Sequence, residues 1–152
     1  MNFLTSYLPY LLRKADQTLS APFYVVLTSH GVARSEWRVL VVLEQLGQLG
    51  VVELAQAALS PQPTVTHAVG RLEQRGMVAR TPGQQDKRQR LISITPAGSS
   101  LTNTLIEEAK RLEAQALADA GDLSDLVAQL QTLTASVEAA INGRPDDPPE
   151  LG

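Results

Sequence analysis

The chain has 152 residues, a formal net charge of −3, no cysteine and 43% hydrophobic residues. That hydrophobic fraction can bury a core, which excludes a wholly disordered chain, and the length suits one domain or two small lobes that share a core. The lack of cysteine excludes disulfides, cysteine nucleophiles and thiolate metal sites, and no apolar run reaches the roughly 18 residues that a membrane span requires.

The first predicted element is a helix over residues 6–30. Ser6 can cap its start, and Pro9 falls in the first turn, where a missing N–H costs nothing. Pro22 should kink or split the helix, and Gly31 should end it. No basic segment precedes an apolar one here, so the N-terminus is unlike a signal peptide and we expect a cytoplasmic protein.

A second and a third helix should follow, with a short strand between them. Ser35 is a good N-cap for the second helix, and Glu36 in its first turn is favoured by the helix dipole. We expect a short edge strand at Val51–Val52 and the third helix over Glu53–Leu59. The residues of the second helix that should face the core are Trp37, Leu40, Val41 and Leu43.

The next helix is predicted to begin with Ser60 as N-cap and Pro61 as its first residue, and to end at Gly76. Its core-facing residues, at positions i, i+4 and i+7, are Val65, Val69 and Leu72. Met77–Thr81 and Arg90–Thr95 are candidate strands joined by a loop, which together make a hairpin.

Two long helices should complete the ordered chain. Thr95-Pro96 repeats the signature of an N-cap followed by proline, and Gly121 separates the two helices. Residues 144–152 are proline-rich and acidic, and we expect them to be disordered. Both helices have an apolar stripe, formed by Leu101, Leu105, Ala109, Leu112 and Ala116 in the first and by Leu126, Leu130, Leu133, Val137 and Ile141 in the second.

This order of elements predicts a mostly α (α+β) fold, because a helix–turn–helix followed by a β-hairpin is a winged helix. A small winged-helix lobe cannot cover the apolar stripes of the terminal helices, so we expect the N- and C-terminal helices to build a dimerisation lobe. The predicted divisions are an N-terminal dimerisation region at 1–34, a winged helix–turn–helix lobe at 35–95 with its wing at about 77–95, C-terminal dimerisation helices at 96–143, and the tail at 144–152.

Positive charge is concentrated in the middle of the chain. Residues 61–95 carry six of the 13 lysines and arginines against two acids, a local charge of +4. Residues 1–60 are neutral, and residues 96–152 have a net charge of −7. Because the Debye length is about 8 Å at physiological salt, the distant acidic segment does not cancel the local potential. A basic helix and hairpin are typical of a protein that binds duplex DNA.

The helix after Pro61 should have a polar stripe opposite its apolar one, because Thr64, His67, Arg71 and Arg75 follow at spacings of three, four and four. The major groove accepts such a helix with its N-terminal residues nearest the base edges. We therefore expect Arg71, further along, to contact phosphate. A solvated outer face is the alternative interpretation. The expected base-contacting residues are Gln62, Thr64, Thr66 and His67.

The tip of the predicted hairpin carries Lys87, Arg88 and Arg90. An arginine at a wing tip can enter the minor groove, where the negative potential favours a guanidinium. Asp86 is unexpected as a DNA contact, so we expect it to pair with a nearby arginine and fix the shape of the tip. A solvated loop is the alternative interpretation.

Three runs of the sequence resemble the MarR family of bacterial transcription regulators: SEWRVLVVL, ELAQAALSPQPTVTHAVGRLEQRGMVAR and DKRQRLISITPAG. The resemblance covers about residues 10–140. It implies a homodimer that binds a palindromic operator through a winged helix–turn–helix and, in many members, a small ligand that weakens DNA binding. The full set of expected DNA-binding residues is Ser35, Gln62, Thr64, Thr66, His67, Arg71, Lys87, Arg88 and Arg90.

The chain departs from the usual family pattern at four places. Leu59-Ser60 forms the turn between the two helices of the predicted helix–turn–helix, where the family often has glycine. His67 stands where arginine is frequent. Gly70 replaces a frequent aspartate, and Gln89 replaces a common serine. These differences bear on the operator sequence rather than on the fold.

Aromatic and basic residues gather on the first two predicted helices, and the resemblance implies an effector site where these helices meet. An arginine beside aromatic rings suits an aromatic carboxylate. We expect Tyr10, Arg13 and Trp37 to contact such a ligand; the alternative is that the aromatic residues belong to the core. The wider cluster also includes Tyr7, Tyr24, His30 and Arg38.

Other chemistry has little support in the sequence. His30 and His67 have no obvious second metal ligand, and neither a Gly-x-Ser-x-Gly run nor a phosphate-binding glycine loop is present. We therefore expect no metal, no cofactor and no enzyme activity. Two functions stay open: a ligand-responsive repressor, or a winged-helix module that binds protein partners without operator DNA. The basic wing favours the repressor.

Overall fold

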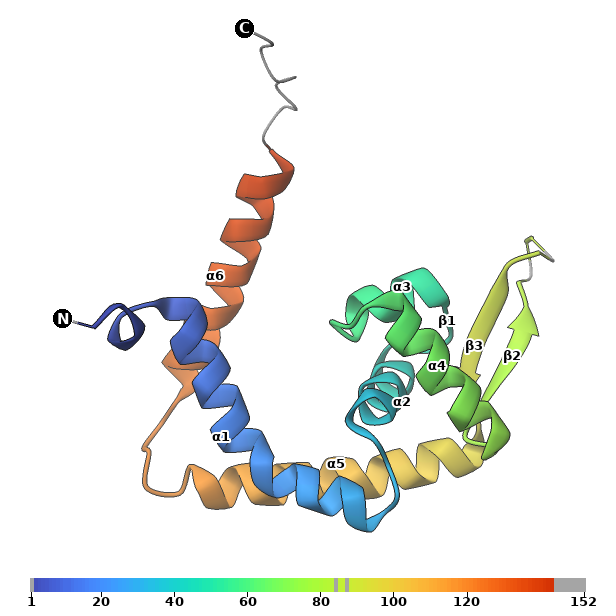
Figure 1. The fold of residues 1–152 in the computed structure, drawn as a ribbon, viewed down its shortest axis with the longest axis horizontal. Helices are drawn as coiled ribbons and strands as arrows, with labels where there is room; N and C mark the ends of the chain where they lie inside the picture. The colour runs from blue at the N-terminus through green and yellow to red at the C-terminus, as the bar shows by residue number, and fades with distance from the viewer. Residues whose placement is uncertain (1, 84, 87, 144–152) are drawn as a thin grey trace, which may run out of the picture. The chain divides into compact units, whose positions relative to one another are not determined.

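The computed structural model describes residues 2–83, 85–86 and 88–143 (Figure 1). They form two compact units, one ending at Ala116 and the other beginning at Leu117. Within these ranges, every helix is too short or too polar to traverse a lipid bilayer. The elements in chain order are a 3-10 helix at Phe3–Thr5, α1 (Leu8–Ser29), α2 (Arg34–Leu46), β1 (Leu49–Gly50), α3 (Val51–Ala57), α4 (Gln62–Gln74), β2 (Val78–Pro82), β3 (Arg90–Ile94), α5 (Pro96–Ala116) and α6 (Ser124–Asn142).

The sheet has three antiparallel strands in the order β1-β3-β2, and β2 and β3 form the predicted hairpin. Leu49 lies opposite Ile92 on one side of β3, and Val78 lies opposite Ile94 on the other. The edge strand expected at Val51–Val52 was wrong by two residues, because Gly50 already serves as the N-cap of α3 and both valines are helical. The sheet therefore fixes the wing directly against the helix–turn–helix.

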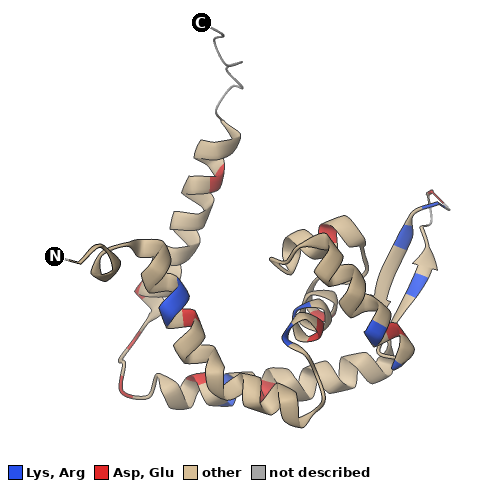
Figure 2. Ribbon diagram, viewed as in Figure 1, with Lys and Arg blue, Asp and Glu red and all other residues tan. Residues whose placement is uncertain are grey.

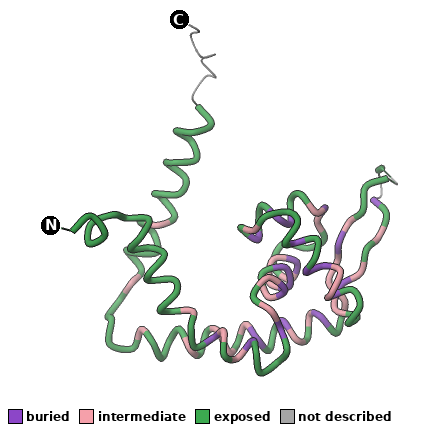
Figure 3. Tube along the Cα trace, in the orientation of Figure 1, coloured by how far each residue is buried: buried purple, intermediate pink, exposed green. Residues whose placement is uncertain are grey.

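The core of the first unit lies where α2, α4, the sheet and α5 meet (Figure 3). The apolar stripe predicted for α4 is confirmed, since Val65, Val69 and Leu72 are at most 1% exposed. Leu40 and Leu43 of α2 are buried as expected. Trp37 and Val41 are only half-buried, because both line a cavity beside α1.

The long helix α1 continues past Pro22 without the expected break. Proline removes the hydrogen bond that its N–H would donate to the carbonyl of Thr18, four residues earlier. Both residues lie on an exposed stretch of the helix, so water can replace that hydrogen bond. The helix therefore reaches from Leu8 to the corner where α2 begins.

Three predicted helix starts are displaced by one or two residues, since Tyr7, Ala33 and Pro61 are the N-caps in place of Ser6, Ser35 and Ser60. For α2 the reason is visible. Glu36 reaches back, and its Oε1 accepts a hydrogen bond from the Ala33 backbone N–H at 3.1 Å. The helix can therefore begin without a serine cap, and Ser35 lies within its first turn.

The start of α5 confirms the predicted cap and explains a glycine. Thr95 Oγ1 accepts a hydrogen bond from the Gly98 backbone N–H at 3.1 Å. A Cβ added at Gly98 would lie 2.1 Å from the Met77 backbone carbonyl oxygen. Only glycine fits where the first turn of α5 passes the chain leading into β2.

Helix α6 forms most of the second unit, and none of its residues is buried. Its apolar stripe is largely exposed, with Val137 at 49% and Ile141 at 65% (Figure 3). The tail at 144–152, which we expected to be disordered, lies outside the described residues.

Candidate nucleic-acid interface

The outward face of α4 presents the polar residues that the sequence predicted. Gln62, Thr64, Thr66 and His67 are all exposed, opposite the buried face of the same helix. An open hollow runs along this face past Gly70 to Gln74. Hydroxyl, amide and imidazole groups of this kind can donate to or accept from base edges.

Gly70 lies within this hollow, and a Cβ added there would meet nothing within 4 Å. The fold therefore does not require glycine at this position, although glycine weakens a helix interior. Because glycine has no side chain, nothing projects from the outward face of α4 at this position.

The structure brings together two predicted DNA-binding residues that are far apart in the sequence. Arg71 on α4 donates a hydrogen bond from Nη2 to Ser35 Oγ on α2 at 3.2 Å. The Arg71 side chain is 42% exposed, so its guanidinium is only partly enclosed by this contact. A hydroxyl, a guanidinium and the first turn of α2 thus lie at one point on the surface, an arrangement that suits phosphate.

A buried carboxylate that the sequence had not marked as part of the interface lies behind Arg71. Glu36 is 5% exposed, and its Oε1 is 3.8 Å from Arg71 Nε. Its Oε2 accepts a hydrogen bond from Arg75 Nη1 at 3.3 Å, and the same Nη1 donates to the Gly31 carbonyl at 2.8 Å. The sequence indicated only that Glu36 is favoured by the dipole of α2, because no local pattern shows which residues of a later helix will approach it.

The wing is the β2–β3 hairpin, and its cationic strands are visible in Figure 2. Arg88 and Arg90 are exposed, while Lys87 lies outside the described residues. Asp86 shapes the tip through the main chain: its Oδ1 accepts a hydrogen bond from the Arg88 backbone N–H at 2.9 Å. Within the described part of the chain no side-chain ion pair involves Asp86. The expected arginine partner is therefore Arg88, which contributes its backbone N–H and not its guanidinium.

A second glycine is required at the base of this tip. The Gly83 N–H donates to the Gln89 carbonyl at 2.6 Å, and the Gln89 N–H donates to the Asp86 carbonyl at 3.1 Å. A Cβ at Gly83 would lie 2.6 Å from that Asp86 oxygen. Below the tip, the Arg80 guanidinium pairs with Glu73 of α4 at 3.3 Å, which joins the wing to the helix.

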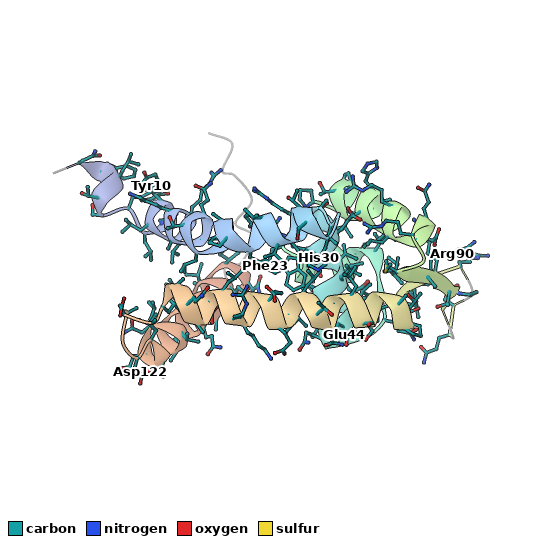
Figure 4. All side chains as sticks on the ribbon, turned by 90° about the horizontal axis from the view of Figure 1, so that it is seen from below. Tyr10, Phe23, His30, Glu44, Arg90 and Asp122 are labelled. Atoms are coloured by element: carbon teal, nitrogen blue, oxygen red, sulfur yellow. The ribbon has the colours of Figure 1, made fainter. Side chains whose placement is uncertain are left out.

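The three expected effector contacts do not come together within one chain. Trp37 packs edge-on against Phe23, with ring centroids 4.9 Å apart. Tyr10 and Arg13 lie on the exposed first half of α1, and Tyr10 is separated from Phe23 by 13 residues, or about 20 Å of helix (Figure 4). Another basic residue, Arg38, does line the cavity beside Trp37.

That cavity lies between α1, α2 and the end of α3. Its walls combine the Trp37 ring with Tyr24, and its rim has Asp16, Ser20 and Arg38. Aromatic walls with a few polar groups are typical of small-molecule sites.

In the described ranges, no group of three or more histidine, aspartate or glutamate side chains is placed to hold a metal ion.

Comparisons with known proteins agree with this geometry. The model of the MarR family matches residues 32–89, from the α1–α2 corner to the wing. The chain is 30% identical over 145 residues to the homoprotocatechuate degradative operon repressor of Escherichia coli, a match that covers 91% of this chain and 92% of the repressor.

Solved structures show the same architecture. A MarR family transcriptional regulator of Silicibacter pomeroyi DSS-3 is 26% identical, with a TM-score of 0.75 over 88% of this chain and 99% of that one. NadR, solved in complex with 4-hydroxyphenylacetate, shares the fold at 24% identity, with a TM-score of 0.75 over 87% of this chain and 92% of that one. These likenesses confirm the predicted fold class, and the Escherichia coli and Silicibacter pomeroyi relatives are a repressor and a transcription regulator rather than enzymes.

Proposed function

The chain belongs to the MarR family, and we propose that it is a homodimeric repressor that binds a palindromic operator and is released by a small ligand. Like its relatives, it is a DNA-binding transcription regulator and not an enzyme. Repression is supported by the name of the Escherichia coli relative, which describes an operon repressor. A regulator of this kind would work in the cytoplasm.

The observation that carries the proposal is the exposed polar face of α4 beside a basic wing. We propose that Gln62, Thr64, Thr66 and His67 contact bases in the major groove. Arg71 and Ser35, which share a hydrogen bond, would together contact one phosphate. The wing residues, Lys87 and the exposed Arg88 and Arg90, would reach the flanking minor groove.

Dimerisation is supported by the apolar residues that the single chain leaves uncovered. On α1 these include Leu8, Leu11 and Leu12, and on α6 they include Val137 and Ile141. Covering such residues with a second copy removes apolar surface from water, the dominant favourable term in association. We therefore propose residues 1–34 and 96–143 as the dimerisation regions. Two-fold symmetry would then place the two α4 helices on half-sites about 34 Å apart.

For the effector we propose a small aromatic carboxylate in the cavity beside Trp37. The carboxylate would pair with a guanidinium while the ring packs against Trp37 and Tyr24. Arg38 supplies that guanidinium within the chain. Tyr10 lies about 20 Å along α1 from Phe23 and would join the cavity only from a second copy, whereas Arg13 lies about one helical turn from Asp16 on the rim.

Calorimetric titration with benzoate and related acids tests the effector proposal. Wild type should give a binding isotherm, and Arg38→Ala should lose it. Loss in Arg13→Ala as well would place Arg13 in the site. Equal binding by wild type and both variants would remove these arginines from the site.

The test of DNA binding is a fluorescence anisotropy titration with the intergenic DNA beside the protein's own gene, repeated at several salt concentrations. Wild type should bind with a steep salt dependence, because each phosphate contact releases counterions. Arg88→Ala should bind more weakly, with a salt slope smaller by about one. Lack of wild-type binding at low salt would favour a module that binds protein partners.

A further inference from the structure

We propose that Glu36 is a positioning residue for DNA recognition, and that its buried carboxylate fixes how α4 presents Arg71 to the DNA backbone. The inference rests on the proposed DNA-binding function and goes beyond it by assigning a role to a residue that does not face DNA. Glu36 lies on α2 and is 5% exposed, whereas the two arginines that it holds are on α4.

Three parts of the chain meet at this carboxylate. Its Oε1 accepts a hydrogen bond from the Ala33 backbone N–H at 3.1 Å and lies 3.8 Å from Arg71 Nε. Its Oε2 accepts from Arg75 Nη1 at 3.3 Å, and that nitrogen also donates to the carbonyl of Gly31 at 2.8 Å. Glu36 and Arg75 together therefore tie the turn after α1, the start of α2 and the second half of α4 into one joint.

The joint limits the freedom of the Arg71 guanidinium. Nη2 is held by Ser35 Oγ at 3.2 Å, and Nε is enclosed beside Glu36 with no hydrogen-bond partner among the described residues. Only the remaining part of the guanidinium faces solvent. A pre-oriented arginine loses less side-chain entropy when it binds phosphate, and a fixed phosphate contact sets the register of α4 on the duplex, so positioning should favour the operator whose bases fit that register.

Charge alone predicts the opposite effect of neutralising Glu36. A carboxylate near DNA repels phosphates, so removing its charge should tighten binding to any duplex. If Glu36 acts by positioning, the same change should weaken binding to the operator and leave binding to unrelated DNA unchanged or tighter. The ratio of the two affinities therefore separates the two accounts.

The experiment compares wild type with Glu36→Gln by fluorescence anisotropy. One probe is a duplex that the wild-type protein selects from a random pool, and the other is a scrambled duplex of the same composition. The glutamine keeps the size of the side chain and can still accept from the Ala33 N–H, but its amide would present N–H groups to Arg75. We expect about tenfold weaker binding to the selected duplex and no loss on the scrambled one.

Glu44→Gln is the matched control. Glu44 is also an α2 carboxylate (Figure 4), but it accepts hydrogen bonds from Ser99 and Asn103 of α5, both at 2.9 Å, and among the described residues it has no hydrogen bond or ion pair with α4. Its substitution should leave the ratio of the two affinities at the wild-type value.

A folding defect is distinguished in two ways. Loss of folded protein would weaken binding to both duplexes by the same factor. In addition, Glu36→Met combined with Arg75→Met replaces both partners by apolar side chains, which restores packing without restoring the joint. This double variant should fold and still lack the operator preference.

Equal loss on both duplexes, or an unchanged or larger affinity ratio in Glu36→Gln, would overturn the positioning role. So would full operator preference in the double variant. If wild type itself shows no preference for any selected duplex, the proposed DNA-binding function fails, and the role of Glu36 fails with it.

Discussion

Two regions of the molecule differ in how much of their apolar surface one chain buries. They are the helix–turn–helix with its wing, and the terminal helices α1 and α6. Within α4, Val65 and Leu72 are at most 1% exposed, and the polar residues face outward. On α6, Val137 and Ile141 remain 49% and 65% exposed. The first region buries its apolar residues within a single chain, whereas apolar residues of α6 and of the first half of α1 stay exposed in it.

The difference suggests a division of labour between the two regions. A lobe that folds on its own residues can keep a fixed polar surface for DNA. In the dimer that we propose, the terminal helices would set the distance between two such surfaces, and a ligand that shifts them would change that distance. Substitutions that affect one region without the other test this difference.

The largest expected effect is the loss of the dimer in Val137→Asp. The carboxylate would be buried in an apolar contact, and a symmetric dimer contains the change twice, so association should weaken by roughly 4 kcal/mol. Sedimentation at micromolar concentration should show a monomer with an intact far-ultraviolet spectrum. Ala135→Asp, on the opposite side of α6, is the control and should remain dimeric. A dimeric Val137→Asp would place the interface elsewhere.

A somewhat smaller effect is expected for Gly98→Ala, which perturbs the region that buries its apolar residues within one chain. The added Cβ would lie 2.1 Å from the Met77 carbonyl oxygen, and backbone cannot move aside easily. We expect a loss of about 2–3 kcal/mol in the free energy of unfolding, measured by urea denaturation. Gly70→Ala is the matched control, because its Cβ meets nothing within 4 Å.

That control should gain up to 1 kcal/mol from better helix propensity. If DNA also approaches the outward face of α4 closely at Gly70, Gly70→Ala should bind the operator less well despite its higher stability. Equal stability changes of the two alanine variants would contradict the close approach at Gly98.

The smallest effect concerns the turn between α3 and α4. Leu59 has a φ of +53° and is 89% exposed, so it adopts a left-handed conformation and packs against little. Leu59→Gly should therefore raise the free energy of unfolding by about 1 kcal/mol. Thermal melts should show the gain, while Leu46→Gly, at the end of α2, should show a loss. A destabilised Leu59→Gly would mean that this side chain has a partner outside the chain.

Local signals made much of the fold predictable. Pro61, Gly76 and the Thr95 cap mark helix ends through chemistry confined to a few residues, and the hairpin alternation is local as well. The strand at Leu49–Gly50 had no such signal, because two residues become a strand only through pairing with β3, about forty positions later. The continuity of α1 through Pro22 depends on solvent exposure, which sequence pattern does not give.

The candidate site was likewise predictable only where its residues lie close together in the sequence. Residues that share one helix or one hairpin tip, such as Thr64, His67 and Arg88, were predictable as groups. The contacts of Ser35 with Arg71 and of Glu36 with Arg75 join residues 36 and 39 positions apart, so they depend on how α2 and α4 pack. The sequence placed Arg71 on the polar side of α4 but could not show what orients it.

Hydroxyl-radical footprinting on a duplex selected by the wild-type protein tests the proposal that two copies of this lobe bind DNA together at a spacing set by the terminal helices. We expect two protected segments related by a two-fold axis and centred one helical turn, about 34 Å, apart, with extra minor-groove protection on the outer flanks from the wings. A single protected segment, or none at salt concentrations where the protein binds, would contradict it.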